Sequence, residues 1–212
     1  MKLEYVPREA LDELLDLIEI AEDKSKIALI DLLRLLMIHE ANAAHVLNKH
    51  WDRFEVSIFG YLQCIDIKDP EAKVMQNYHL GSLRMLANIY QTDSGKDFLQ
   101  GEDASNALLH FCNFSLDSVN PKVVFTAAVV IFNQVLCFKR EKTLIKGALE
   151  HVLQKISQTI TDPLLTDNEA FLGLLLCECR IFFMNKNACE FAKDKIPSFR
   201  ENHQKLKARV SA

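Results

Sequence analysis

The feature that most constrains the fold of this chain is an order of helices, short, medium and long, that returns roughly every 45 residues. Each expected helix carries apolar residues three or four positions apart and is bounded by polar segments, several of which contain proline. The helices are predicted at residues 7–21, 26–40, 43–49, 51–67, 71–91, 94–100, 103–116, 121–138, 145–161, 167–184, 187–193 and 198–208, with a brief helical turn after residue 140. Such a chain can bury its apolar faces by stacking each group of three helices on the next.

The repeat is visible in the residues as well as in the helix lengths. The segment LRLL at 33–36 overlays LRML at 83–86, and Asn88 overlays Asn133 at a separation of 45. Glycine (6) and proline (5) are too scarce for a sheet protein of 212 residues, which needs many turns. The sequence therefore predicts an all-α, armadillo-like helical-repeat solenoid of about five to six full or partial repeats, forming a single domain over residues 1–212.

A polar stripe follows one edge of the expected helix 71–91. Asn77, Gly81, Arg84 and Asn88 recur at steps of four, three and four, which places them on one face. Because the third helices of an armadillo solenoid line its concave surface, we expect this stripe to face a groove. Arginine there can pair with acidic groups, and asparagine, a poor mid-helix residue, can bind a peptide backbone. The predicted peptide-binding residues are Arg34, Arg84, Asn88, Asn133 and Arg180; the alternative is that they are ordinary helix-surface positions.

The stripe is less regular in the later repeats. Val129 stands where the third repeat needs an arginine to continue the basic line, so we expect an interrupted basic groove. In the fourth repeat, a shift of 45 residues selects Glu178, whereas a shift of 47 selects Gly173 and Arg180. We favour the second register because it aligns a glycine with a glycine.

Composition argues against several classes of protein. The formal net charge of −4 and the pI near 6.0 give no general affinity for nucleic acid. The N-terminal segment MKLEYVPREALDEL is charged, unlike a signal peptide, and the apolar runs fall short of the roughly 20 residues of a membrane span. The six cysteines lie mostly in apolar helical stretches, as small buried residues of a reducing cytosol do. We expect a soluble intracellular protein.

No sequence pattern predicts an active site or a metal centre. The chain has no glycine-rich phosphate loop, and its carboxylates are spread over helix surfaces with none enclosed by apolar sequence. His39, His45 and His50 are expected to be surface or boundary residues; the last two are five apart, which is wrong for metal ligands one helical turn apart. We therefore predict no catalytic, cofactor-binding or metal-binding residue.

Three segments, taken in order, resemble the PUL domain of the phospholipase A-activating protein family. They are LIDLLRLLMIH at 29–39, LGSLRMLANIYQTDSGKDFLQ at 80–100 and NPKVVFTAAVVIFNQVLCF at 120–138. Leucine-rich helices match many sequences by chance, but three in this order at this spacing rarely do. The resemblance covers about residues 27–184, which is most of the chain.

This resemblance implies an armadillo-like domain at the C-terminal end of a longer protein with a WD-repeat propeller and a ubiquitin-binding module. It implies an adaptor that binds the C-terminal tail of the hexameric AAA+ segregase, valosin-containing protein. That tail is an acidic, extended peptide with a tyrosine near its end, and the adaptor serves ubiquitin homeostasis and proteasomal degradation. The implied location is the cytoplasm and nucleus, and ubiquitin is reached only through the other domains of the parent protein. Phosphorylation of the tyrosine is expected to weaken binding if its ring must enter a tight pocket.

Two other functions compete with this one. The chain could be a helical-repeat scaffold that binds its partner through the outer surface. It could also be a helical hydrolase or transferase whose site has no sequence signature, and such an enzyme would need a deep pocket with converging polar groups. Charge reversal at Arg34 and Arg84 distinguishes the groove from the outer surface.

Overall fold

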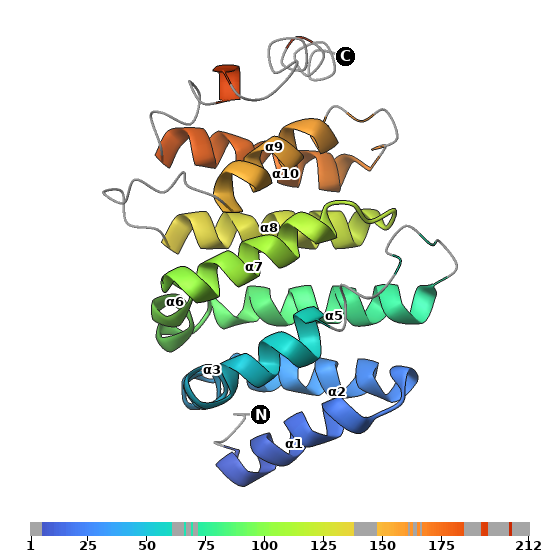
Figure 1. Ribbon diagram of the computed structural model, residues 1–212, viewed down its shortest axis with the longest axis vertical. Coiled ribbons are helices and arrows are strands. Elements are labelled where there is room, and N and C mark those ends of the chain that lie inside the picture. The colour runs from blue at the N-terminus through green and yellow to red at the C-terminus, as the bar shows by residue number, and fades with distance from the viewer. Residues whose placement is uncertain are drawn as a thin grey trace. The chain divides into compact units, whose positions relative to one another are not determined.

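The computed structural model describes residues 6–60, 72–137, 148–160, 167–184 and 192–194, together with five single positions at 66, 69, 162, 165 and 204. Every regular element in these residues is a helix (Figure 1). The elements are α1 (Arg8–Ile20), α2 (Asp23–Leu36), α3 (Glu40–Phe54), η1 (Glu55–Gly60), α5 (Lys73–Ile89), α6 (Asp93–Leu99), α7 (Glu102–Ser115), α8 (Pro121–Cys137), α9 (Ala148–Ile160) and α10 (Asn168–Met184). The predicted all-α helical-repeat class is confirmed. The helices predicted at 187–193 and 198–208, and the turn after residue 140, lie almost entirely outside the described residues.

The chain divides into two compact units, Met1–Ala107 and Leu108–Ala212, and the boundary falls inside α7. In both units a long helix packs against the next long helix of the chain. This pairing joins α2 to α5 in unit 1 and α8 to α10 in unit 2. The sequence prediction of one domain over the whole chain stays a prediction.

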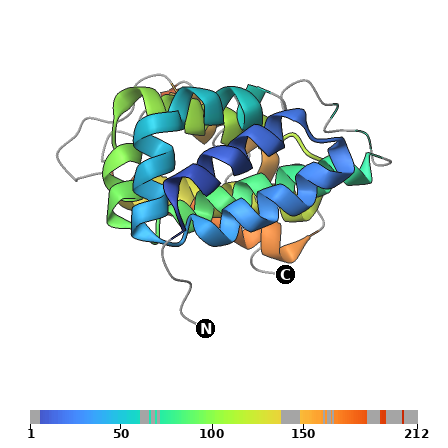
Figure 2. The same cartoon turned by 90° about the horizontal axis from the view of Figure 1, so that it is seen from below.

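The first helices of unit 1 follow the apolar pattern of the sequence. In α1, Leu11, Leu14, Leu15 and Ile18 are buried, which is the face that their spacing predicted. Figure 2 views unit 1 from the α1 end, where α1 lies in front of α2 and α3 and contacts both. The sequence prediction for α2 was wrong at its start, because the helix begins at Asp23 rather than at residue 26. A carboxylate in the first turn is favourable beside the unpaired N–H groups at a helix N-terminus.

The packing of α2 on α5 depends on a glycine in the middle of α5. A Cβ atom at Gly81 would lie 3.1 Å from the Cγ2 atom of Ile30, a side chain of α2 that is fully buried. The absence of a side chain at Gly81 therefore lets the two long helices approach closely. This glycine belongs to the stripe predicted to face a groove, but its packing role is inside the unit.

Helix α3 joins two helices that the sequence predicted to be separate, at 43–49 and 51–67. His50 has φ −127° and ψ 18°, outside the helical region, and this residue kinks the helix at the predicted boundary. The π-helix η1 follows directly. Arg53, after the kink, forms ion pairs with Asp16 and Glu19 and so ties α3 to α1.

In unit 2, α10 packs against α8 and α9. A Cβ atom at Gly173 of α10 would lie 3.0 Å from Cδ2 of Phe125 and 3.6 Å from the Cβ atom of Ala128, both residues of α8. Nearby, the thiol of Cys177 donates a hydrogen bond to the backbone carbonyl of Ala128 at 2.7 Å. Gly173 thus has the same packing role against the preceding long helix as Gly81, which favours the register that aligns these two glycines.

Candidate peptide-binding residues

Arg84 is the most accessible of the predicted binding residues. It lies on the exposed face of α5, in a helix whose other faces bury Leu83, Met85 and Leu86. Within the part of the chain that the structure describes, no residue forms a hydrogen bond or an ion pair with its guanidinium group. An exposed guanidinium group without such a partner can form two parallel hydrogen bonds to an incoming carboxylate, because no bond to the described residues must first be broken.

Arg34 of α2 is half-buried and already has a partner. Its Nε atom donates to Oδ1 of Asp31 at 2.7 Å, and the side chain of Asp31 is 58% exposed. An exposed pair three residues apart on a helix contributes only about 0.5 kcal/mol or less. An acidic ligand can therefore replace Asp31 at little cost, although Arg34 is less available than Arg84.

Asn88 links α5 to α2 rather than facing solvent alone. Its side-chain Nδ2 donates to the backbone carbonyl of Arg34 at 2.9 Å. That carbonyl is one of the last four of α2, which have no partner inside their own helix. The amide of Asn88 retains a second N–H and a carbonyl oxygen. The predicted contact between Asn88 and a peptide backbone stays a prediction, and the sequence did not reveal its contact with α2.

We expect Asn88→Ala to lower the free energy of unfolding by about 1 kcal/mol, because the carbonyl of Arg34 loses its partner. Urea denaturation of the full chain measures this loss. Asn77→Ala is the matched control, since Asn77 is an exposed residue of the same helix and its replacement should leave stability unchanged. Equal stability of the two variants would show that the contact between Asn88 and α2 does not stabilise the protein.

The other two predicted residues belong to unit 2, where Asn133 lies on α8 and Arg180 on α10, both half-buried. Leu172 and Leu176 precede Arg180 at steps of four, so the three share one face of α10. These leucines are 54% and 60% exposed. The face that carries Arg180 is therefore largely apolar.

Glu178, the residue selected by the alternative register, is buried and accepts a hydrogen bond from the hydroxyl of Ser157 in α9. The sequence expectation that no carboxylate is enclosed was therefore wrong. Glu178 points into unit 2 and is not available to a ligand on the surface. The exposed face of α10 is instead the one that carries Arg180.

Exposed apolar side chains also flank Arg34 on α2. Leu32, Leu35 and Ile38 are 46%, 39% and 46% exposed. They recur at steps of three, which keeps them close to one another on the surface of α2 and its C-terminal turn. The predicted basic surface is thus mixed in character, with arginine beside leucine and isoleucine.

The buried cysteines are poor nucleophiles. Burial raises the pKa of Cys177 to about 12 and raises the pKa of Cys112 further, so both remain thiols at neutral pH. Cys179, by contrast, is exposed, because residues two apart on a helix point in different directions. The expectation of buried, unpaired cysteines is confirmed for Cys112 and Cys177, whereas Cys64 and Cys189 lie outside the described residues.

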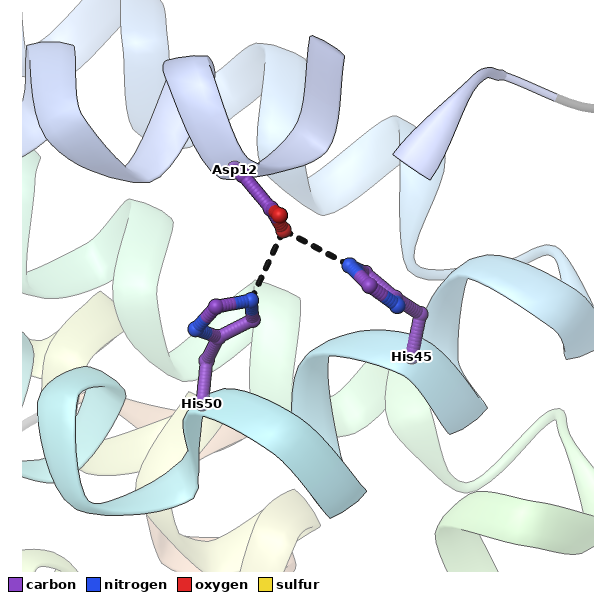
Figure 3. Close-up of side chains that lie close together, drawn as sticks. All are labelled: Asp12, His45 and His50. Atoms are coloured by element: carbon purple, nitrogen blue, oxygen red, sulfur yellow. Dashed lines mark hydrogen bonds and ion pairs between the residues drawn. The ribbon is translucent and has the colours of Figure 1, made fainter. Parts of the chain in front are cut away.

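His45 and His50 are intermediate in burial, as expected for boundary residues, but the sequence did not reveal that they share a partner. The Nε2 atoms of both rings lie 2.7 Å from Oδ1 of Asp12, a residue of α1 (Figure 3). The side chains of His45 and His50 are only 7% and 13% exposed. The kink in α3 brings together two residues that a straight helix would separate.

Residues 8–196 match the family model of the PUL domain. The chain belongs to the PUL-domain family. The resemblance noted in the sequence is confirmed, and the match runs through both compact units. PUL domains are protein-interaction domains, so the general function is the binding of protein partners.

No curated protein and no solved structure matches the chain. None of the described helices combines the length and the apolar character needed to cross a membrane.

Proposed function

We propose that this PUL domain binds the acidic C-terminal tail of the AAA+ segregase, valosin-containing protein, and acts as an adaptor in ubiquitin-dependent degradation. The observation that carries the proposal is Arg84, an exposed cation on α5 that has no partner among the described residues. The proposal includes the cytoplasm and nucleus as the place of action. The domain itself needs no cofactor for this function.

The side chains beside the arginines fit the two kinds of group in such a tail. Arg84, and Arg34 once it leaves Asp31, can bind acidic side chains or the terminal carboxylate. The exposed Leu32, Leu35 and Ile38 offer apolar area to a tyrosine ring next to Arg34. Because the chain as a whole has a net charge of −4, attraction of an acidic peptide must come from these local cations.

We expect Arg84→Glu to weaken binding of a fluorescent tail peptide about ten- to hundredfold, because a charge-assisted hydrogen bond is replaced by repulsion. Fluorescence anisotropy with the full chain measures the dissociation constant. Binding by the unmodified protein should also weaken with added salt, since exposed charges are screened.

Arg8→Glu is the matched control, because it makes the same change in net charge on the exposed surface of α1. It should leave the dissociation constant within about twofold of the original value, since Arg8 lies on α1 and is not one of the proposed peptide-binding residues of α2 and α5. If Arg34→Glu and Arg84→Glu combined left the affinity unchanged, the peptide would bind elsewhere. The outer-surface alternative would then replace this proposal.

A further inference from the structure

Asp12, His45 and His50 form a compact cluster of metal-ligand side chains within unit 1, here called the Asp12 cluster. Asp12 lies on α1, and both histidines lie on α3. The Nε2 atom of each ring lies 2.7 Å from the same carboxylate oxygen, Oδ1 (Figure 3). The two rings are edge-to-face with centroids 5.3 Å apart. Three potential ligand atoms therefore converge on one point between two helices.

The convergence depends on the kink in α3. In a regular helix, residues five apart differ by about 140° around the axis and point to different sides. His50 has φ −127° and ψ 18°, which are not helical values. The helix is therefore interrupted at His50, and the side chain of His50 can point to the same side as that of His45. The side chains of His45 and His50 consequently reach the same oxygen of Asp12.

We propose that the Asp12 cluster binds a divalent transition-metal ion, zinc in the first instance, through His45 Nε2, His50 Nε2 and Asp12 Oδ1. Two imidazoles and one carboxylate are a ligand set typical of zinc, with water in the fourth position of a tetrahedron. The three ligand atoms already lie within 4.8 Å of one another. The site is independent of the peptide-binding proposal.

The geometric adjustment required between each ring and the carboxylate is small. Zinc bonds of about 2.0–2.1 Å to nitrogen and 2.0–2.2 Å to oxygen place tetrahedral ligand atoms about 3.3 Å apart. Each Nε2 atom must therefore move about 0.6 Å away from Oδ1 to admit the ion. Rotation of side chains achieves such a shift. The side chain of Asp12 is 31% exposed, so the ion can reach the site from solvent.

Metal binding changes which nitrogen of each ring carries hydrogen. Without metal, each Nε2 donates a hydrogen bond to Oδ1, because a carboxylate accepts only. Coordination requires the Nε2 lone pair, so a neutral ring exchanges this hydrogen for one on Nδ1, whereas a protonated ring releases one proton to solvent. Affinity for zinc should consequently fall as the pH is lowered.

Lys49 gives the proposal its sharpest test. Its Nζ atom lies 2.8 Å from Oδ2, the second oxygen of Asp12, and its side chain is 57% exposed. Lys49 thus leaves Oδ1 for the metal but places a positive charge beside the incoming cation. We expect Lys49→Gln to raise zinc affinity about three- to tenfold through loss of this repulsion. A cluster that serves only as a salt bridge would show no such gain.

The test uses the full chain, freed of metal with a chelator and titrated with Co²⁺ and then Zn²⁺. One equivalent of Co²⁺ should give the visible absorption of tetrahedral nitrogen and oxygen coordination, and Zn²⁺ should abolish it. His45→Gln and His50→Gln should each lower zinc affinity at least about tenfold, since each removes one of three ligands. His151→Gln and Cys179→Ser are matched controls at exposed positions of unit 2 and should bind as the original does.

Circular dichroism establishes that each variant is folded. If His45→Gln fails to fold, because its side chain is largely buried, His50→Gln and Lys49→Gln decide the question. The proposal is wrong if the original chain binds no stoichiometric Zn²⁺, if the Cys179→Ser control loses the site, or if Lys49→Gln leaves the affinity unchanged.

Discussion

Replacing Gly95 by alanine should lower the free energy of unfolding by at least about 3 kcal/mol, the upper range for overpacking. Gly95 lies in the first turn of α6, where a Cβ atom would stand 2.2 Å from the backbone oxygen of Ile89 and 2.6 Å from Oγ1 of Thr92. Without a clash, alanine would stabilise the helix by about 1 kcal/mol relative to glycine. A lower free energy of unfolding in the variant would therefore be caused by the clash. Urea denaturation measures the change.

The clash cannot be relieved by rotating a side chain. The oxygen of Ile89 belongs to the backbone at the end of α5, and Thr92 bonds to it through its hydroxyl at 2.8 Å while accepting from the N–H of Gly95 at 3.0 Å. Gly60→Ala is the control, because among the described residues no atom outside the adjoining backbone lies within 4 Å of the added Cβ. Equal stability of the two alanine variants would show that α6 can move away from α5.

A second large effect is expected from acid. His79 of α5 is 3% exposed, and this burial lowers its pKa to about 4 from the usual histidine value of 6.5. The unfolded chain then binds more protons than the folded chain between these two values. Stability is therefore complete above about pH 6.5 and falls by about 3 kcal/mol as the pH is lowered to 4. Urea denaturation at a series of pH values measures the fall.

His79→Gln should flatten this profile between pH 6.5 and 4, because glutamine does not titrate. His110→Gln should leave the slope unchanged, since His110 is exposed. Asp12 affects stability only at lower pH. Hydrogen bonds from Lys49 and His45 lower its pKa below the value of about 4 that it has in the unfolded chain, so its contribution to stability is lost only below about pH 4. If the free energy of unfolding of His79→Gln still fell between pH 6.5 and 4, His79 would not be the cause of the acid sensitivity.

The helices could be predicted because their signal is local. Helix α5 was expected at 71–91 and is found at Lys73–Ile89, and α8 was expected at 121–138 and is found at Pro121–Cys137. Buried residues recur every three or four positions in these segments, and that period is set by the helix itself. The start of α2 was less predictable, because polar residues before an apolar run suit a loop and a first helical turn equally well.

The Asp12 cluster could not be predicted in the same way. A polar boundary at His50 was visible in the sequence, which separated two expected helices there. On one straight helix, residues 45 and 50 would point in different directions and could not bind one metal ion, whereas the kink at His50 changes the direction of its side chain. The third member, Asp12, is more than thirty residues away in the sequence. Only the packing of α1 on α3 makes it a neighbour.

By itself, the sequence determined the helical class, the order of the helices and the PUL resemblance, since these depend on residue spacing along the chain. The tertiary structure decided what individual polar residues contact. It gave Asn88 the carbonyl of Arg34 as a partner, and it left Arg84 exposed on the same helix. These contacts depend on how one helix is placed against another, and a spacing rule within one helix contains no information about that placement.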